Sequence, residues 1–348
     1  MPLAGFFLAE TGSRPLALAR IAMGIAAFIR AGAQYETLRS LLNGGSIRAG
    51  RVAWLPALTE GTLLPFMAVW MLACVSFAVG FKTRLSGGLI AACIAYQIAF
   101  DQNLYANNFY LMLLIVFLIT VADSGRSFSV DRRLSHGGRE LVARWPTLLL
   151  RLQISIVYFY TALMKVDSTF LTGEPIARST WLGAYLEKTA VPMAAAYATV
   201  GLEFFLPIAL WIPSLRRAAV ALAFLLHFHI FVGMNARFTV IMLTFGITTL
   251  APLLLFLEHP PGSRVVLWDE SSAAARRWVA LFRFFDWLGI YRYETASVPG
   301  LALTLDDRTL TGFDAAREVL CTLPVTFYWA PLLAVPPLPA LARRASGL

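Results

Sequence analysis

The stretch TLLLRLQISIVYFYTALMKVDSTFLTG, residues 147–173, decides the fold. It is apolar and aromatic for about the length of one membrane crossing, and this apolar run ends at Lys165. On a helix, Thr161 and Tyr158 lie one and two turns before Lys165, so a hydroxyl, a phenol and an ammonium share one face. Arg151 extends the same stripe. A polar stripe on an otherwise apolar helix predicts polar partners on the neighbouring helices.

The composition indicates an integral membrane protein. Of the 348 residues, 58% are hydrophobic and 14% are charged, and the mean hydropathy is +0.68, which exceeds what a water-soluble chain needs to bury a core. The net charge of +9 is spread along the chain, and no nucleic-acid-binding motif is present. We therefore expect membrane lipids, and no nucleic acid, as partners.

Eight apolar segments have the length of a membrane-spanning helix or slightly less. They cover residues 15–33, 62–81, 85–100, 107–122, 147–165, 189–215, 218–234 and 238–257. The sequence therefore predicts an all-α polytopic membrane helical bundle of about eight transmembrane helices over residues 1–258.

The basic residues of the short loops predict the orientation. Most lie at 82–84, 126–144 and 216–217, although the opposite loops are not free of arginine and lysine. By the positive-inside rule these three loops and both termini are cytoplasmic, in a multi-pass protein of the bacterial inner membrane. Five polar residues are then expected at the outer face, and two more deeper in the membrane: Asn107, Asn108, Lys165, Asn235 and Arg237, with Glu203 and His227 below them.

Each polar residue within a span has a structural explanation beside the functional one. Lys165 can snorkel to the membrane interface, and His227 can be packed with a hydrogen bond to a neighbouring carbonyl. Glu203 must be paired or protonated, and its expected partners are His227, Arg20 or Arg30.

A smaller α/β domain is predicted over residues 263–348, after Pro260, Pro261 and Gly262 end the last span. The pattern predicts a strand at 264–268, a helix at 271–285, a second strand at 290–294, a hairpin within 301–312 and a helix at 313–323.

Three segments resemble the horizontally transferred transmembrane (HTTM) domain family. The likeness is strongest at VYFYTALMKVDSTFLTG (157–173), which is similar to the segment around the active-site lysine of the vitamin K-dependent gamma-carboxylase branch. RPLALARIAMGIAAF (14–28) and FYLMLLIVFLITVADSGRSFSVDRR (109–133) match the family as well. The resemblance implies that Lys165 is a catalytic base acting on a quinone-like lipid. A partly desolvated amine beside Arg151 or another cation would suit that role.

The chain also departs from the carboxylase pattern. That branch has Asn-Asn-His-Ser-Tyr-Leu where this chain has ANNFYL (106–111), so Asn108 or Phe109 stands in the place of the histidine. Neither side chain can carry a proton between groups. We therefore do not expect gamma-glutamyl carboxylation of clotting-type substrates.

The C-terminal domain resembles a shortened, thioredoxin-like thiol-disulfide oxidoreductase of the DCC family. Asp269 matches the aspartate of that signature, but Ser272 and Ala275 occupy the two cysteine positions. Neither can form a thiolate, so exchange chemistry is not expected. A structural or docking module is the better interpretation.

The leading hypothesis is an enzyme that acts at the outer face on a lipid-soluble molecule, with Lys165 as base. The pocket-lining residues would be Tyr158, Thr161, Asn107, Asn108, Glu203, His227 and Arg237. The alternative is a non-catalytic membrane partner in peptide maturation, export or immunity. No metal site is predicted, because His227 and His229 point about 200° apart on a helix and no cysteines are closely spaced.

Overall fold

The computed structural model describes the chain in segments and divides it into two compact units. The described residues are 3–45, 47, 49–50, 52, 54–135, 139–181, 183–186, 188–234, 239–257, 264–305, 308–328, 333, 335 and 338–347. The units are Met1–Phe256 and Leu257–Leu348, and each is described by itself.

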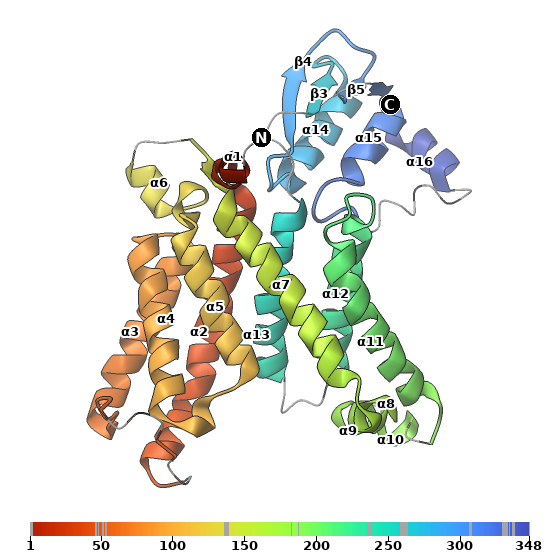
Figure 1. Ribbon diagram of the computed structural model, residues 1–348. Helices are drawn as coiled ribbons and strands as arrows, with labels where there is room; N and C mark the ends of the chain where they lie inside the picture. The colour runs from red at the N-terminus through yellow and green to blue at the C-terminus, as the bar shows by residue number, and fades with distance from the viewer. Residues whose placement is uncertain are drawn as a thin grey trace. The chain divides into compact units, whose positions relative to one another are not determined.

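The first unit is helical (Figure 1). Its long helices are α2 (Arg14–Leu42), α3 (Glu60–Val79), α4 (Thr83–Phe100), α5 (Asn107–Val121), α7 (Arg144–Lys165), α11 (Val191–Ala209), α12 (Arg216–Gly233) and α13 (Thr239–Leu250). The shorter elements are α1 (Leu3–Leu8), β1 (Glu10–Gly12), η1 (Gln102–Leu104), η2 (Ser124–Arg126), α6 (Val130–Leu134), β2 (Leu141–Ala143), α8 (Ser168–Leu171), α9 (Glu174–Ser179), α10 (Gly183–Leu186) and η4 (Ala251–Leu257).

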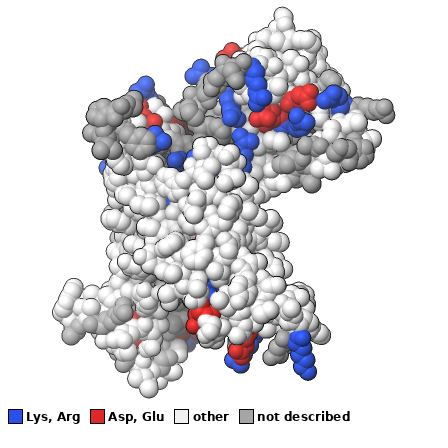
Figure 2. All heavy atoms as spheres, turned by 45° about the vertical axis from the view of Figure 1, so that its right-hand side comes forward, with Lys and Arg blue, Asp and Glu red and all other residues white. Residues whose placement is uncertain are grey.

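The prediction of a helical membrane bundle is confirmed. Among the described residues, seven helices are long and apolar enough to cross a membrane, with η4 counted as the continuation of α13, and α5 is a shorter apolar helix of 15 residues. Each of the eight predicted segments overlaps one of these helices. On the face of the helical unit that Figure 2 shows, a broad band of uncharged side chains lies between charged residues near the two ends. One difference is that α2 continues to Leu42, beyond the predicted end at residue 33.

The helices form two groups, which are joined by α13 and by the packing of α5 on α7 (Figure 1). Helices α2 to α5 pack on one another, α7 packs on α11, and α13 contacts both α2 and α12. Close packing within the first group depends on small residues. A Cβ atom built on Gly24 of α2 would lie 2.7 Å from the Cβ atom of Ala78 in α3. Such backbone proximity is typical of membrane helices that meet through small side chains.

Arg20 anchors the turn between α5 and α6. Its guanidinium is fully buried and donates hydrogen bonds to the carbonyl oxygens of Ser124 (2.6 Å), Ser127 (3.3 Å) and Phe128 (2.5 Å). Carbonyl oxygens therefore take the place of the carboxylate expected for this arginine, because the turn supplies three acceptors around one guanidinium.

The second unit is a small α/β domain, as predicted. Its elements are β3 (Arg264–Trp268), α14 (Ala273–Phe285), β4 (Tyr291–Thr295), β5 (Leu301–Thr304), β6 (Thr309–Thr311), α15 (Gly312–Leu320) and α16 (Leu338–Ser346). The sheet order is β4-β3-β5-β6, with β3 parallel to β4 and antiparallel to β5. The apolar faces of α14 and α15 supply core residues such as Phe282, Phe313 and Val319.

Candidate functional site

Lys165, at the last position of α7, pairs with Glu203 in the middle of α11. The Lys165 Nζ atom lies 2.5 Å and 2.6 Å from the two carboxylate oxygens. The Glu203 side chain is 6% exposed and that of Lys165 is 28% exposed. A carboxylate in this position would be costly without a partner, and the lysine supplies both charge and hydrogen bonds. Of the partners expected for Glu203, neither His227 nor an arginine of α2 is the one observed.

Three helices bring their polar side chains together around His227. The His227 Nε2 atom lies 3.1 Å from the Tyr158 hydroxyl of α7 and 3.0 Å from the Thr249 hydroxyl of α13. Tyr158 and His227 are both buried, and the Phe245 ring packs edge-on against the imidazole at 5.5 Å between centroids. The observed partners are therefore two hydroxyl groups, whereas a backbone carbonyl was the expected structural partner.

An apolar pocket of about 680 Å³ lies beside these groups, between α5, α7 and α13. Four of the predicted site residues line it, and the rest of its lining is mainly apolar. The lining residues are Asn107, Asn108, Leu111, Ile156, Val157, Tyr160, Thr161, Met164, Lys165, Ile241, Met242 and Phe245. The α7 residues Ile156, Tyr160 and Met164 are exposed on the outside of the bundle, so the pocket is bordered by surface that would face lipid.

The other predicted site residues lie elsewhere. Tyr158, Glu203 and His227 are absent from the lining of the apolar pocket. Glu203 and His227 each contact a lining residue, and Tyr158 contacts His227. Glu203 bonds to Lys165, and His227 packs on Phe245. Asn235 and Arg237 fall outside the described residues. His229 lines a separate cavity of about 120 Å³.

Arg151 does not neighbour the lysine as the shared stripe suggests. It donates a hydrogen bond to the Leu255 carbonyl and lies 5.5 Å from the centre of the Phe256 ring. Arg30 lies 5.3 Å from the centre of the Phe109 ring. Among the described residues, the charged group that bonds to Lys165 is therefore the Glu203 carboxylate, whereas the family resemblance suggested a second cation there.

The α13 wall of the pocket is the part that sequence reasoning misses. Ile241, Met242 and Phe245 are apolar residues in an apolar helix, and no pattern separates a pocket wall from a lipid-facing surface. Thr244, Thr248 and Thr249 are a weak signal, because three buried hydroxyls in one span indicate an inward face. Only Thr249 reaches the site.

In the α/β unit, the positions that match the DCC signature, Asp269, Ser272 and Ala275, lie at the start of helix α14. Ser272 is the N-cap of α14, and its hydroxyl accepts a hydrogen bond from the Ala275 backbone N–H at 3.3 Å. Asp269 accepts hydrogen bonds from the Ser271 side chain and backbone, which hold the pKa of its carboxyl below its usual value. These groups cap a helix, and no thiol lies among them.

The helical unit and its polar site define a multi-pass membrane protein with an ion pair at the edge of a lipid-facing pocket. The model of the HTTM domain matches residues 10–260, and the chain belongs to the HTTM domain family. No solved structure matches the chain. Among the described residues, no three His, Cys, Asp or Glu side chains are grouped so that they could hold a metal ion.

Proposed function

We propose that this protein is an enzyme that removes a proton from a lipid-soluble substrate bound in the apolar pocket, with the Lys165–Glu203 pair as the acid–base unit. The observation that carries the proposal is the position of Lys165, which lines the pocket and bonds to a buried carboxylate at the same time. An acidic hydroxyl, as in a hydroquinone, is the substrate class that the family resemblance suggests.

The pair, and not the lysine alone, moves the proton. An ammonium that donates two hydrogen bonds to a carboxylate already carries its proton, so the Glu203 carboxylate is the group that can accept another. Because Lys165 lines the pocket and Glu203 does not, the proton would move by relay: the Lys165 ammonium would pass a proton to the Glu203 carboxylate, and the amine that remains would take the proton of the substrate hydroxyl. The ammonium formed in this way would stabilise the substrate oxyanion. This differs from a free lysine amine acting as base.

Two further features suit an oxyanion in the pocket. Asn107 and Asn108 lie in the first turn of α5, where side-chain amides and unpaired backbone N–H groups can donate hydrogen bonds. The pocket volume of about 680 Å³ is in the range of small-molecule sites. The exposed Met164 and Tyr160 side chains at its edge would let a lipid-soluble molecule enter from the bilayer.

Native mass spectrometry of the purified full-length protein tests the proposal. We expect a bound lipid-soluble small molecule in the wild type, its loss in Lys165→Met, and its retention in Lys188→Met, which removes an exposed lysine elsewhere. An unliganded wild type, or an adduct that persists in Lys165→Met, would contradict the proposal.

A charge-swapped variant distinguishes an ion pair that is needed for function from one that only holds α7 and α11 together. Lys165→Glu with Glu203→Lys keeps an ion pair between α7 and α11 but puts a carboxylate at the pocket. We expect stability near that of the wild type and no ligand binding or turnover. If the swapped variant binds and turns over normally, the pair is only structural.

The second candidate function is a non-catalytic partner in peptide maturation, export or immunity. The α/β unit favours it, because a folded unit without a thiol at the Ser272 and Ala275 positions suits docking better than exchange chemistry. Under this alternative, Lys165→Ala leaves the cellular phenotype intact as long as the protein inserts.

A further inference from the structure

A second cavity lies at the end of the helical unit that holds the turns between α3 and α4 and between α5 and α6. We call it the basic pocket, and its volume is about 600 Å³. Five cations and two carboxylates line it, together with small and apolar residues. The lining residues are Lys82, Thr83, Arg84, Leu85, Asp123, Gly125, Arg126, Asp131, Arg132, Ser135 and Arg139.

The frame of the basic pocket is fixed by buried and charge-assisted hydrogen bonds. Asp131 accepts hydrogen bonds from the backbone N–H groups of Lys82 (2.7 Å) and Thr83 (2.8 Å) and from the Thr83 hydroxyl (2.5 Å). Behind it, the buried Arg20 holds the carbonyls of the turn that follows α5. Because Asp131 already occupies the start of α4, that helix end is not an open anion site.

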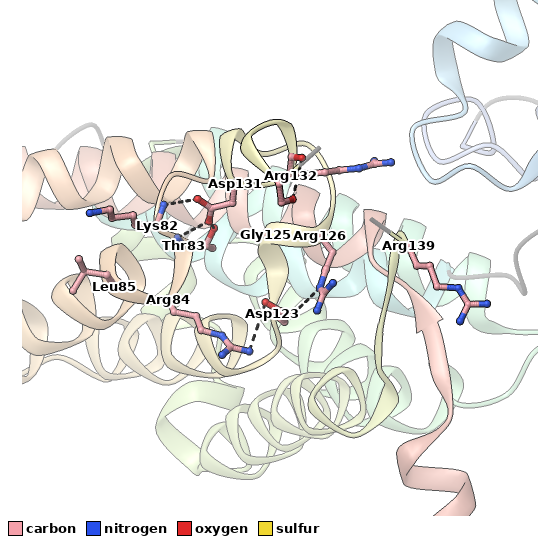
Figure 3. A pocket seen from close by; sticks show the side chains of 11 residues that line it. Lys82, Thr83, Arg84, Leu85, Asp123, Gly125, Arg126, Asp131, Arg132 and Arg139 are labelled. Atoms are coloured by element: carbon pink, nitrogen blue, oxygen red, sulfur yellow. Dashed lines mark hydrogen bonds and ion pairs between the residues drawn. The ribbon is translucent and has the colours of Figure 1, made fainter. Parts of the chain in front are cut away.

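Several cations around this frame are held loosely. Arg84 and Arg126 both converge on Asp123 (Figure 3), but the Arg84 contact is 3.6 Å long and its side chain is 73% exposed. Arg139 lies 3.7 Å from Glu10 and is 82% exposed. The Lys82 ammonium has no carboxylate within 4 Å in the described part of the chain. These side chains can turn toward an anion at little cost.

Positive charge remains in excess when the charged residues at the edge of the basic pocket are counted as well. The carboxylates at the edge are Glu10 and Glu140, and Glu140 pairs with both Arg132 and Arg14. Arg14 at this edge and Arg133, which follows Arg132 in α6, bring the total to seven cations against four carboxylates. A site of this kind binds a compact anion with several acceptor oxygens, such as a phosphate.

A groove with a mixed lining, half apolar and half polar or charged, adjoins the basic pocket and shares Arg132 with it. This groove has a volume of about 630 Å³ and is lined by Val79, Phe128, Ser129, Val130, Arg132 and Arg133. Val79 and Phe128 are exposed, as is Leu85 of the basic pocket itself. Helices α3, α4 and α5 all begin or end here. In a bilayer spanned by these helices, the basic pocket would lie near the depth at which lipid phosphates meet the hydrocarbon.

We propose that the basic pocket binds the phosphate of an anionic phospholipid head group, with the acyl chains along the exposed apolar side chains beside it, Val79, Phe128 and Leu85. These exposed apolar side chains favour a lipid over a soluble phosphate, because a soluble phosphate has no apolar part that could cover them. The predicted orientation assigns this lipid to the cytoplasmic leaflet. The proposal concerns a different site from the Lys165 pocket and does not depend on it.

Lipid titrations of the full-length protein in detergent, followed by native mass spectrometry, test the proposal. The probes are phosphatidylglycerol, phosphatidylcholine with the same acyl chains, and inorganic phosphate. The variant Lys82→Gln/Arg84→Gln removes two exposed cations of the basic pocket. The matched control Arg39→Gln/Lys188→Gln removes one arginine and one lysine that are exposed elsewhere.

We expect the wild type to bind phosphatidylglycerol in preference to phosphatidylcholine. The pocket variant should bind phosphatidylglycerol about tenfold more weakly, because two positively charged side chains that would contact the anionic head group are removed. The affinity of the control should stay within about twofold of that of the wild type. Equal loss in both variants, or no preference for the anionic lipid, overturns the proposal. Displacement of phosphatidylglycerol by millimolar inorganic phosphate would overturn the lipid assignment. Unchanged circular dichroism and melting temperature show that each variant is folded.

Discussion

Lys165 takes part in two environments at once, since its ammonium lines an apolar pocket and bonds to the buried Glu203 carboxylate. Each group makes the charge of the other tolerable in a region of low polarity. A buried pair of this kind stabilises a fold only weakly in comparison with apolar residues of the same size, yet it is costly to break from one side. Stability measurements can therefore separate the cost of an orphaned charge from the value of the pair.

We expect Lys165→Met to lower the free energy of unfolding by about 3 kcal/mol, because the Glu203 carboxylate loses its only described ionic partner. The double variant Lys165→Met/Glu203→Met should recover most of this loss, since neither charge then remains. Denaturant titration in detergent micelles, monitored by tryptophan fluorescence, measures both. Two single effects that simply add in the double variant would contradict the coupling.

The sequence predicts which residues share a helix face better than it predicts their partners on other helices. The spacing of Tyr158, Thr161 and Lys165 places them on one helix face, because helical periodicity is a local property. The pairing of Glu203 with Lys165 depends on which helices become neighbours, and no local pattern distinguishes that lysine from His227 or an arginine of α2. The bond from Asp131 to the start of α4 joins residues 48 positions apart and leaves no sequence signature.

At the scale of elements, the start of α4 is capped by another helix. Its own N-cap residue, Lys82, is left-handed at φ 44° and makes no side-chain capping bond, so Asp131 of α6 supplies the acceptor. Burial opposes ionisation of Asp131. The hydrogen bonds from Thr83 and Lys82 outweigh this effect, and the pKa of the carboxyl lies below its usual value. The cap therefore works in its ionised form.

Asp131→Asn should lower the free energy of unfolding by about 1 kcal/mol at pH 7, as loss of a good helix cap does. A folded-state pKa below the unfolded value stabilises the protein above the unfolded pKa of roughly 3.9. This contribution is lost as the pH falls through the folded pKa. Thermal unfolding of wild type and variant from pH 7 to pH 3 should thus converge at the acidic end. Exposed Glu60→Gln serves as the control, with a change below about 0.5 kcal/mol at pH 7. A gap that stays constant over the range would exclude an ionised cap.

The packing of α2 on α3 leads to a prediction with an internal control. Gly24 has three Ala78 atoms within 2.8 Å of the position that its Cβ atom would take, whereas Gly32 in the same helix has nothing within 4 Å. Gly24→Ala should therefore push α2 away from α3 and lower the free energy of unfolding by about 1–3 kcal/mol.

Gly32→Ala should leave stability unchanged or raise it by up to about 1 kcal/mol, because alanine favours the helix and meets no neighbour. Parallel denaturant titrations of the two variants give the comparison. If both substitutions have the same effect, helix propensity alone explains them and the close approach at Ala78 is not important for stability.

At the scale of the whole molecule, the two proposed sites lie at opposite ends of the helical unit. Lys165 ends α7, whereas the basic pocket lies near the residues that begin α7 and α4. A helix of 22 residues is about 33 Å long, which is the thickness of the hydrocarbon region. The enzyme site and the lipid site would therefore face opposite leaflets of one membrane.

Cysteine labelling tests which leaflet each site faces. In a background without Cys74, Cys93 and Cys321, Lys188→Cys marks the Lys165 end, and Arg139→Cys marks the basic pocket. Exposed Glu294→Cys marks the α/β unit. Because the short basic loops predict a cytoplasmic location for the basic pocket and the C-terminus, a membrane-impermeant maleimide should label Lys188→Cys in intact spheroplasts. It should label Arg139→Cys and Glu294→Cys only in inverted vesicles. Labelling of Arg139→Cys from outside would show that the orientation is the reverse of the predicted one, and the proposed lipid would then lie in the outer leaflet. Labelling of Lys188→Cys and Arg139→Cys from the same side would contradict a bundle that spans the membrane.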